Sequence, residues 1–173
     1  MPSVYLVSDT HFGHRGMTTF LTDDGNKVRP WDDVESMNRD LIAYWNATVK
    51  PNDKVYHLGD VVINRRYLPI VGELNGEKVL IKGNHDAFRL EEYTPYFRDI
   101  RAYHAMNNFL LSHIPVHPNQ LRRWKGNIHG HLHSNVLEDV RYMNVSVEQT
   151  NYRPILFEKV LEAYRARGVA TDG

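Results

Sequence analysis

The sequence predicts an α/β fold in which two packed β-sheets are flanked by helices. The first half alternates short apolar, β-branched segments with segments of helical periodicity, which is typical of parallel strands joined by crossover helices. The second half holds four short apolar segments in succession, and one more helical segment follows them. The mixture of the two patterns indicates an α/β sandwich.

In the first half we expect strands at residues 3–9, 53–60 and 77–86, and helices at 31–49 and 65–76. Either Asp32 or Asp33 can cap the first helix. Its apolar residues recur on one face, at Val34, Met37, Leu41 and Trp45. The second helix contains Pro69 and is closed by Gly76.

The second half is expected to begin with a hairpin of residues 100–105 and 108–113 around Asn107 and Asn108. Two more strands are expected at 126–133 and 141–148. The last helix, 154–168, has Pro154 near its first turn and ends before Gly168. Its buried stripe is expected at Leu156, Val160 and Tyr164.

Length and composition exclude several classes of protein. The 173 residues suit a single domain spanning 1–173, with no repeat or low-complexity linker. Lys and Arg number 21, as do Asp and Glu, so no global basic field favours non-specific nucleic-acid binding. The absence of cysteine excludes a disulfide scaffold and a thiolate metal site. No charged leader or long apolar segment starts the chain, so we expect a cytoplasmic protein without a membrane segment.

Polar side chains recur at the predicted carboxyl ends of the strands, where ligands bind in open α/β sheets. Five separate segments contribute them, and the residues are Asp9 and His11, Asp60, Asn84 and His85, His113, and His131 with His133. One such residue alone would be read as a turn or a strand-end cap. Five segments that bring Asp, His and Asn to one edge indicate a shared site.

Spacing and chemistry then favour two metal ions. Residues i and i+2 of an extended backbone point to one side, so Asp9 with His11, and His131 with His133, can face one cavity. Oxygen and imidazole ligands suit Mn, Fe or Zn better than Ca or Mg. The set is too large for one tetrahedral ion and suits two ions about 3.5–4 Å apart that share a carboxylate. Two divalent ions with two anionic ligands leave a positive site, which favours a phosphate substrate.

The ordered segments "DTH", "GD", "GNHD", "SH" and "GHLH" resemble those of the calcineurin-like metallophosphoesterases, in a small single-domain form of the prokaryotic or phage type. The resemblance runs from Asp9 to His133. It implies a four-layer αββα sandwich of two mixed β-sheets. It also implies two divalent transition-metal ions, for which Mn is expected first and Fe, Zn or Ni remain open.

The resemblance implies a role for each residue. The ligands of one metal would be Asp9, His11 and His133, those of the other Asn84, His113 and His131, and the bridging carboxylate Asp60. His85 would contact the phosphate and act as general acid to the leaving group, while a metal-bridging hydroxide attacks phosphorus. Asp86 would orient the His85 imidazole.

The remaining histidines have weaker assignments. His14 and His117 are candidate substrate contacts, together with Asn84 and His85. The other three are expected within strands, His57 and His129 in the core or bracing a ligand and His104 on the surface. The segment from Arg122 to Lys125 could bind a nucleotide, although a solvated loop explains such a cluster more often.

Phosphodiester hydrolysis is the expected activity. The related protein phosphatases carry a phosphate-binding arginine four residues after the bridging aspartate, and here that position is Asn64. The expected substrate is a nucleotide, a cyclic nucleotide or a nucleic-acid end, and no obligate protein partner is evident. Two alternatives remain: a phosphomonoesterase of the same family, and a non-catalytic interaction scaffold on the same fold, such as the one in the retromer complex.

Overall fold

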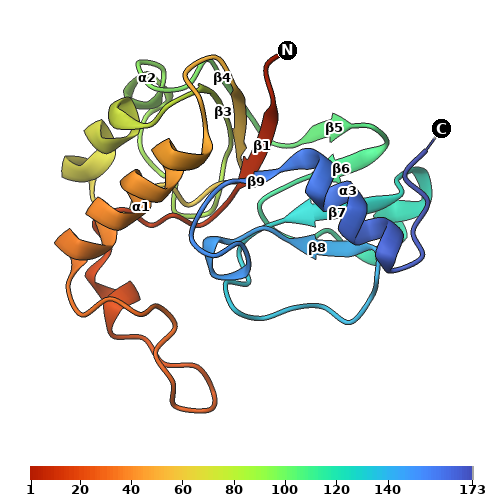
Figure 1. Cartoon of the computed structure of the whole chain (residues 1–173), viewed down its shortest axis with the longest axis horizontal. Helices are drawn as coiled ribbons and strands as arrows, with labels where there is room; N and C mark the ends of the chain where they lie inside the picture. Colours follow the sequence, from red (N-terminus) through yellow and green to blue (C-terminus); the bar gives the residue numbers. More distant parts are fainter. Residues whose placement is uncertain (173) are drawn as a thin grey trace.

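The computed structural model describes residues 1–172, which form two mixed β-sheets flanked by helices (Figure 1). The first sheet has the strand order β4-β3-β2-β1-β9. Its strands are β1 (Val4–Val7), β2 (Lys54–His57), β3 (Glu77–Ile81), β4 (Asp99–Arg101) and β9 (Ile155–Leu156). The first four strands run parallel, and β9 is antiparallel to β1. The expected class, an α/β sandwich of two mixed sheets, is confirmed.

The second sheet has the order β5-β6-β7-β8. Its strands are β5 (His104–Met106), β6 (Phe109–Leu111), β7 (Gly126–His129) and β8 (Tyr142–Asn144). The strands β5 and β6 form the expected hairpin, and β6, β7 and β8 are parallel. The hairpin turn places Asn107 and Asn108 at φ values of 49° and 65°, a left-handed conformation that asparagine tolerates well.

The segment expected as one strand at 100–105 is divided between the two sheets. Its beginning lies in β4, beside β3, and its end lies in β5, beside β6. One strand cannot pair with both neighbours, because they belong to different sheets. The chain therefore breaks at Ala102 and Tyr103 and crosses from one sheet to the other.

Two helices differ from expectation, and one agrees. Helix α1 (Val34–Thr48) is capped by Asp33, whose carboxylate accepts the Ser36 N–H at 2.7 Å, and the four expected apolar residues are buried. The segment 65–76 forms a 3-10 helix, η2 (Arg65–Glu73), with Pro69 inside it. Helix α3 (Phe157–Ala166) starts later than expected, because the residues before it pair with β1 as β9. Leu156 thus lies in a strand, and Phe157 joins Val160 and Tyr164 in the buried stripe.

The other helices are short. They are η1 (Arg15–Thr18), α2 (Leu90–Tyr93), η3 (Pro118–Arg123) and η4 (Val147–Gln149). No helix within residues 1–172 is long and apolar enough to span a membrane.

The alternation of side chains along the first sheet creates two apolar cores. Val7, Val55 and Leu80 face α1 and η2 in one cluster. Leu6 and Val79 face the other way, into a cluster with residues of the second sheet and of α3. The first sheet is thereby buried on both faces, which holds the ends of its parallel strands in fixed positions.

Candidate metal centre

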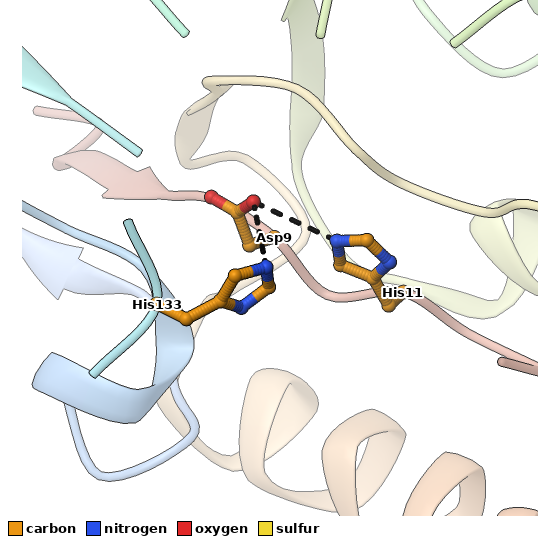
Figure 2. Close-up of side chains that lie close together, drawn as sticks. All are labelled: Asp9, His11 and His133. Atoms are coloured by element: carbon orange, nitrogen blue, oxygen red, sulfur yellow. Dashed lines mark ion pairs between the residues drawn. The ribbon is translucent and has the colours of Figure 1, made fainter. Parts of the chain in front are cut away.

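The first group of side chains in the site consists of Asp9, His11 and His133 (Figure 2). The first two lie just after β1, and His133 lies after β7, so the group joins the two sheets. The Nε2 atoms of His11 and His133 are 3.6 and 3.7 Å from the Asp9 Oδ1 atom. These three side chains could hold one metal ion.

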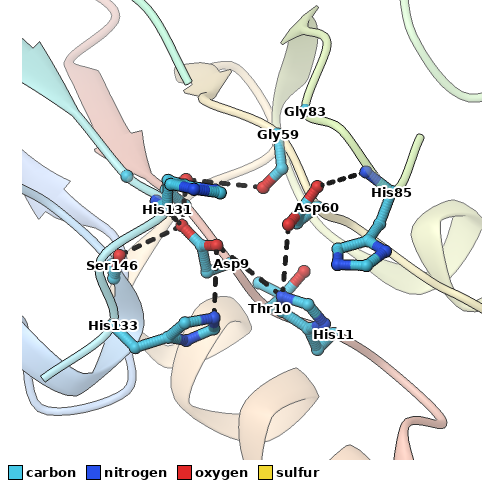
Figure 3. Close-up of polar contacts among 12 residues, drawn as sticks. Asp9, Thr10, His11, Gly59, Asp60, Gly83, His85, His131, His133 and Ser146 are labelled. Carbon is cyan, nitrogen blue, oxygen red and sulfur yellow. Dashed lines mark hydrogen bonds and ion pairs between the residues drawn. The ribbon is translucent and has the colours of Figure 1, made fainter. Parts of the chain in front are cut away.

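The two carboxylate oxygens of Asp9 have different surroundings (Figure 3). Its Oδ2 atom accepts hydrogen bonds from the hydroxyls of Ser8 (2.6 Å) and Ser146 (3.0 Å) and from the His131 backbone N–H (2.8 Å). Its Oδ1 atom is buried and has no hydrogen-bond partner, and the same is true of the His11 Nε2 atom. Buried polar atoms are normally paired, so this pair of orphaned atoms fits a cation between them.

The second group consists of Asp60, His113 and His131, with Asn84 beside them. The Asn84 Oδ1 atom is 2.9 Å from the His113 Nε2 atom and 3.0 Å from the His131 Nδ1 atom. These two ring nitrogens are themselves 3.3 Å apart. The Asp60, His113 and His131 side chains could hold a second metal ion.

Asp60 lies between the two groups. Its Oδ2 atom is 3.5 Å from the His11 Nε2 atom and 3.4 Å from the His113 Nε2 atom. Its Oδ1 atom accepts the His85 backbone N–H at 2.9 Å. As in Asp9, one oxygen is held by the protein and the other faces imidazole nitrogens of the site.

The hydrogen bonds of the imidazoles determine which ring nitrogens face the centre. In three imidazoles the Nδ1 atom forms a hydrogen bond outside the centre. The partners are the His14 Nδ1 atom for His11 (3.3 Å), the Leu58 carbonyl for His113 (2.6 Å) and the Glu148 carboxylate for His133 (3.0 Å). A carbonyl or carboxylate partner requires the Nδ1–H tautomer, which leaves the Nε2 lone pair free. Such outer contacts orient metal-binding histidines in proteins. The donor set therefore fits divalent transition metals.

The backbone at these residues is not extended, contrary to expectation. Asp9, His11, Asp60, His131 and His133 have φ values of 58°, 50°, 57°, 70° and 51°. This left-handed conformation is uncommon outside glycine and clusters at functional sites. The pairs at i and i+2 still converge, but through tight turns after β1 and β7 rather than through the alternation of a strand.

Glycines allow the loops to approach one another closely. A Cβ atom on Gly83 would lie 2.2 Å from the Asp60 Oδ1 atom, and one on Gly130 would lie 2.3 Å from the Asp9 Oδ2 atom. A Cβ atom on Gly59 would lie 2.5 Å from the Gly83 backbone nitrogen. Each of these glycines directly precedes a residue of the site. The same cause, the lack of space for a side chain between the loops, therefore explains the glycine in the pairs Gly-Asp, Gly-Asn and Gly-His.

The electrostatics of the two aspartates favour their charged forms. Burial by itself raises the pKa of Asp9, but its contact with His11 and the nearby His113 and His133 outweigh burial and lower it. Burial likewise raises the pKa of Asp60, and its contacts with His11 and His113 reverse the shift. Both groups thus stay anionic at neutral pH, as metal ligation requires.

His85 and Asp86 have separate surroundings. The His85 side chain is exposed and lines a cavity with His11, and the two rings are 5.7 Å apart. The buried Asp86 carboxylate accepts the backbone N–H groups of Gly83 (2.8 Å), Asp60 (2.7 Å) and Val61 (3.0 Å). No hydrogen bond joins it to the His85 imidazole within residues 1–172. Asp86 therefore does not bond to the imidazole that it was expected to orient. It instead holds the backbone at Asp60, Val61 and Gly83.

Of the candidate substrate contacts His14 and His117, the structure brings only His14 to the site. His14 lines the same cavity as His85 and bonds to His11. Burial, with the positive fields of His11 and His85, lowers its pKa to about 4. His117 caps η3 and lines a different hollow, beside Leu137 and Tyr142.

The remaining histidines, His57, His104 and His129, are partly or fully buried. His57 and His129 are buried, as expected, at 1% and 0% exposure. His104 is half-buried rather than on the surface, because its ring stacks on Tyr56 with centroids 4.8 Å apart. In the segment 122–125, Arg122 and Arg123 are exposed in the last turn of η3 and are not among the residues lining the cavity beside His85.

Two charged residues behind the first group were not anticipated. Glu148, in η4, contacts His133 and also accepts the Arg29 Nε–H at 2.8 Å. Arg29 is fully buried and donates to the backbone carbonyls of Asp9 and Thr10. The only signal in the sequence was a glutamate at the end of a predicted strand, a position that the other site residues share.

Comparisons with known proteins agree with this geometry. The sequence model of the family described as calcineurin-like phosphoesterase matches residues 2–168. An uncharacterized protein of Methanocaldococcus jannaschii is 35% identical over 177 residues, which cover 94% of this chain and 91% of that protein.

One solved structure shares the fold over nearly the whole of this chain. The crystal structure of a protein of unknown function from Aquifex aeolicus matches with a TM-score of 0.74 at 27% identity, covering 94% of this chain and 99% of that one. A nuclease from Pseudomonas putida, MPE, matches 75% of this chain and 61% of its own with a TM-score of 0.48 at 18% identity.

Proposed function

This chain belongs to the calcineurin-like phosphoesterase family, whose members are metal-dependent phosphoester hydrolases, and from that premise we propose that it is a binuclear phosphodiesterase. The proposed ligands of one ion are Asp9, His11 and His133, and those of the other are Asn84, His113 and His131. Asp60 is the proposed bridge. One observation carries this proposal. In Asp9 and in Asp60, one carboxylate oxygen accepts hydrogen bonds from the surrounding protein, and the other oxygen faces imidazole nitrogens.

The proposed cofactors are two divalent transition-metal ions, with Mn first and Fe, Zn or Ni as alternatives that the same nitrogen and oxygen donors accept. When bound, such ions supply Lewis acidity toward the phosphoryl oxygens and toward the attacking water. The protein supplies the geometry, because both aspartates and His113 are buried among hydrogen-bond donors and acceptors that fix their orientation.

His85 is the proposed general acid. Its backbone N–H is held by Asp60, and its ring is exposed on the cavity side of the centre. As the oxygen of water bonds to phosphorus and its proton passes to the solvent, the bond from phosphorus to the leaving oxygen breaks, and the His85 imidazolium donates its proton to that oxygen. A group that reaches over the centre without belonging to either cluster is suited to this task.

The absence of a permanently cationic side chain from the described lining of the cavity beside His85 favours a diester over a monoester. Asn64 caps η2 by accepting the Arg66 N–H at 3.1 Å, and Arg65 pairs with Glu92 at 2.6 Å. No arginine or lysine is among the described residues that line the cavity beside His85. A diester carries one negative charge, so it needs less compensation than a dianionic monoester.

A substrate comparison tests this proposal. The protein is stripped with a chelator, reloaded with Mn, Ni or Zn, and assayed with bis(p-nitrophenyl) phosphate and p-nitrophenyl phosphate. We expect no turnover after chelation, recovery with Mn, and a higher kcat/KM for the diester. A preference for the monoester, or for a phosphoserine peptide, would replace the diester assignment with that of a phosphomonoesterase.

A series of leaving groups tests His85 separately. His85→Asn should retain both ions and slow the cleavage of esters with poor leaving groups by roughly 10²–10⁴-fold. Nitrophenolate departs without a proton, so its ester should lose less. Equal losses for good and poor leaving groups would assign His85 to phosphate binding, and loss of an ion would assign it to the ligands.

A further inference from the structure

The cavity beside the candidate metal centre has one polar and one apolar side. Its volume is about 380 Å³, and His11, His85 and His133 line the side toward the centre. The apolar part of the lining, called the apolar side below, consists of Met17, Phe20, Leu21, Val28 and Leu132. An apolar surface offers a phosphoryl group neither a charge nor a hydrogen-bond donor, so this side of the cavity requires a different explanation.

Most of the apolar side comes from one hairpin, residues 20–28, which projects from the molecule next to α1 (Figure 1). The backbone N–H of Val28 donates to the Phe20 carbonyl at 2.9 Å, and that of Thr22 donates to the Asn26 carbonyl at 2.7 Å. At the base of the hairpin the Lys27 ammonium bonds to the Trp31 carbonyl at 2.9 Å. These bonds give the 20–28 hairpin a defined shape, so it can present side chains in fixed positions.

Phe20 and Leu21 are exposed to an unusual degree for large apolar residues, at 49% and 61%. The Phe20 ring stands edge-on to the His14 ring, with centroids 5.7 Å apart and an interplanar angle of 77°. Gly16 makes room for both rings, because a Cβ atom there would lie 2.6 Å from the Phe20 ring and 2.9 Å from the His14 ring. The Phe20 ring is thus seated at the cavity and leaves half of its surface free.

We propose that the 20–28 hairpin recognises a planar aromatic group, such as a nucleoside base, in the ester that is bound at the metal centre. This inference rests on the proposed phosphodiesterase function and adds the substrate class. The cavity volume is within the range of sites for small organic ligands. Aromatic side chains bind bases by stacking, whatever the base sequence. The polar residues Thr22 and Asp23 also line the cavity and can meet the polar edge of a base.

Two diesters with the same leaving group test the proposal: the p-nitrophenyl ester of thymidine 5′-monophosphate and methyl p-nitrophenyl phosphate. The measured quantity is the ratio of their kcat/KM values with the Mn-loaded protein. In the wild type this ratio should exceed one. In Phe20→Ala it should fall about tenfold or more, mainly through KM, because a stacking contact is lost.

Two further variants make the test specific. Phe20→Leu keeps an apolar side chain without the planar ring, and its ratio should also fall. Tyr103→Ala removes an aromatic residue of 60% exposure that does not line the cavity, and its ratio should match the wild type. Melting temperature and metal content check that each variant is folded and loaded.

The two levels of the proposal fail in different ways. Equal kcat/KM values for the two diesters in the wild type, or an unchanged ratio in Phe20→Ala, would overturn the role of the hairpin alone. An unchanged ratio in Phe20→Leu would overturn stacking, because aliphatic contact would then suffice. Failure of the metal-loaded wild type to cleave either diester would overturn the phosphodiesterase function itself.

Discussion

The two groups of candidate ligands differ in what holds them. Behind Asp9, His11 and His133 lie charged and polar side chains, with Glu148 and Arg29 forming a buried ion pair. Behind Asp60 and His113 lie backbone groups. These are the Leu58 carbonyl, which bonds to His113, and the N–H groups of Asp60 and Val61, which donate to Asp86. Single substitutions should therefore adjust the first group, whereas the second group depends on the conformation of its loops.

The largest effect is expected where the two groups meet. Asp60→Ala should lower the affinity for both ions, because the Oδ2 atom faces His11 and His113 alike. Loss of several kcal/mol of transition-state stabilisation corresponds to roughly a thousandfold loss of activity. Metal titration by calorimetry and metal content after dialysis measure the effect. The matched variant is His133→Ala, which should lower the affinity for one ion only. Two ions bound to Asp60→Ala with unchanged affinity would show that Asp60 is not the bridge.

Asp86→Asn should weaken the second group through its backbone. The substitution leaves one side-chain oxygen, which cannot accept from all three of Asp60, Val61 and Gly83, and it turns an amide NH₂ group toward the remaining backbone N–H. A buried donor left unpaired costs about 1–3 kcal/mol, so the unfolding free energy should fall by that amount. Denaturant unfolding of the metal-free protein measures it, with exposed Asp24→Asn as the control. A loss equal to that of the control would contradict the role given to Asp86.

Glu148→Gln tests the first group. Loss of the charge behind His133 should lower the affinity for one ion by about 10- to 100-fold and leave the other unchanged. The control is Glu158→Gln, an exposed glutamate on α3. Competition with a chelator of known affinity resolves the two steps. Equal weakening of both steps would mean that the Arg29–Glu148 pair supports the whole centre rather than one half.

The effect that is smallest at neutral pH, and that grows only in acid, concerns His57, which forms hydrogen bonds with Thr10 and Gly59 beside the two groups. Its Nδ1 atom accepts the Gly59 N–H at 3.1 Å, so its protonation there would oppose that bond. Burial lowers the pKa of His57 to about 3, from its ordinary value of 6.5. The unfolded chain takes up this proton first, so unfolding free energy should decrease as pH falls from 6.5 toward 3, by up to about 1.4 kcal/mol per pH unit. In the metal-free His57→Gln variant this pH dependence should be shallower, and an identical slope in denaturant unfolding would exclude His57 as its source.

Much of the site could be predicted because its residues follow a simple rule. Parallel strands bring their carboxyl ends to one edge, so polar residues after β1, β2 and β3 had to lie near one another. The left-handed backbone of Asp9 and Asp60 could not be predicted, because nothing in an aspartate requires a positive φ. Only the loop contacts in the folded protein determine it.

The misses in the fold have a related cause. Apolar content identified residues 100–105 as strand but could not show that its two ends pair in different sheets. Helical periodicity placed Leu156 in the last helix, whereas pairing with Tyr5 holds it in β9. The contact of Arg29 with Glu148 joins residues 119 positions apart, and no local pattern marks such a pair.

The distribution of the site over both sheets has a consequence for folding thermodynamics. Loops after β1, β2 and β3 supply part of each group, and loops after β6 and β7 supply the rest. Ions bound there would act as cross-links between the sheets and would bind the folded chain in preference to the unfolded one. Each ion present at a hundredfold excess over its Kd would then add about 2.7 kcal/mol to the free energy of unfolding. Chelation should accordingly lower the melting temperature as well as the activity. An equal melting temperature with and without Mn would show that bound ions do not stabilise the contact between the two sheets.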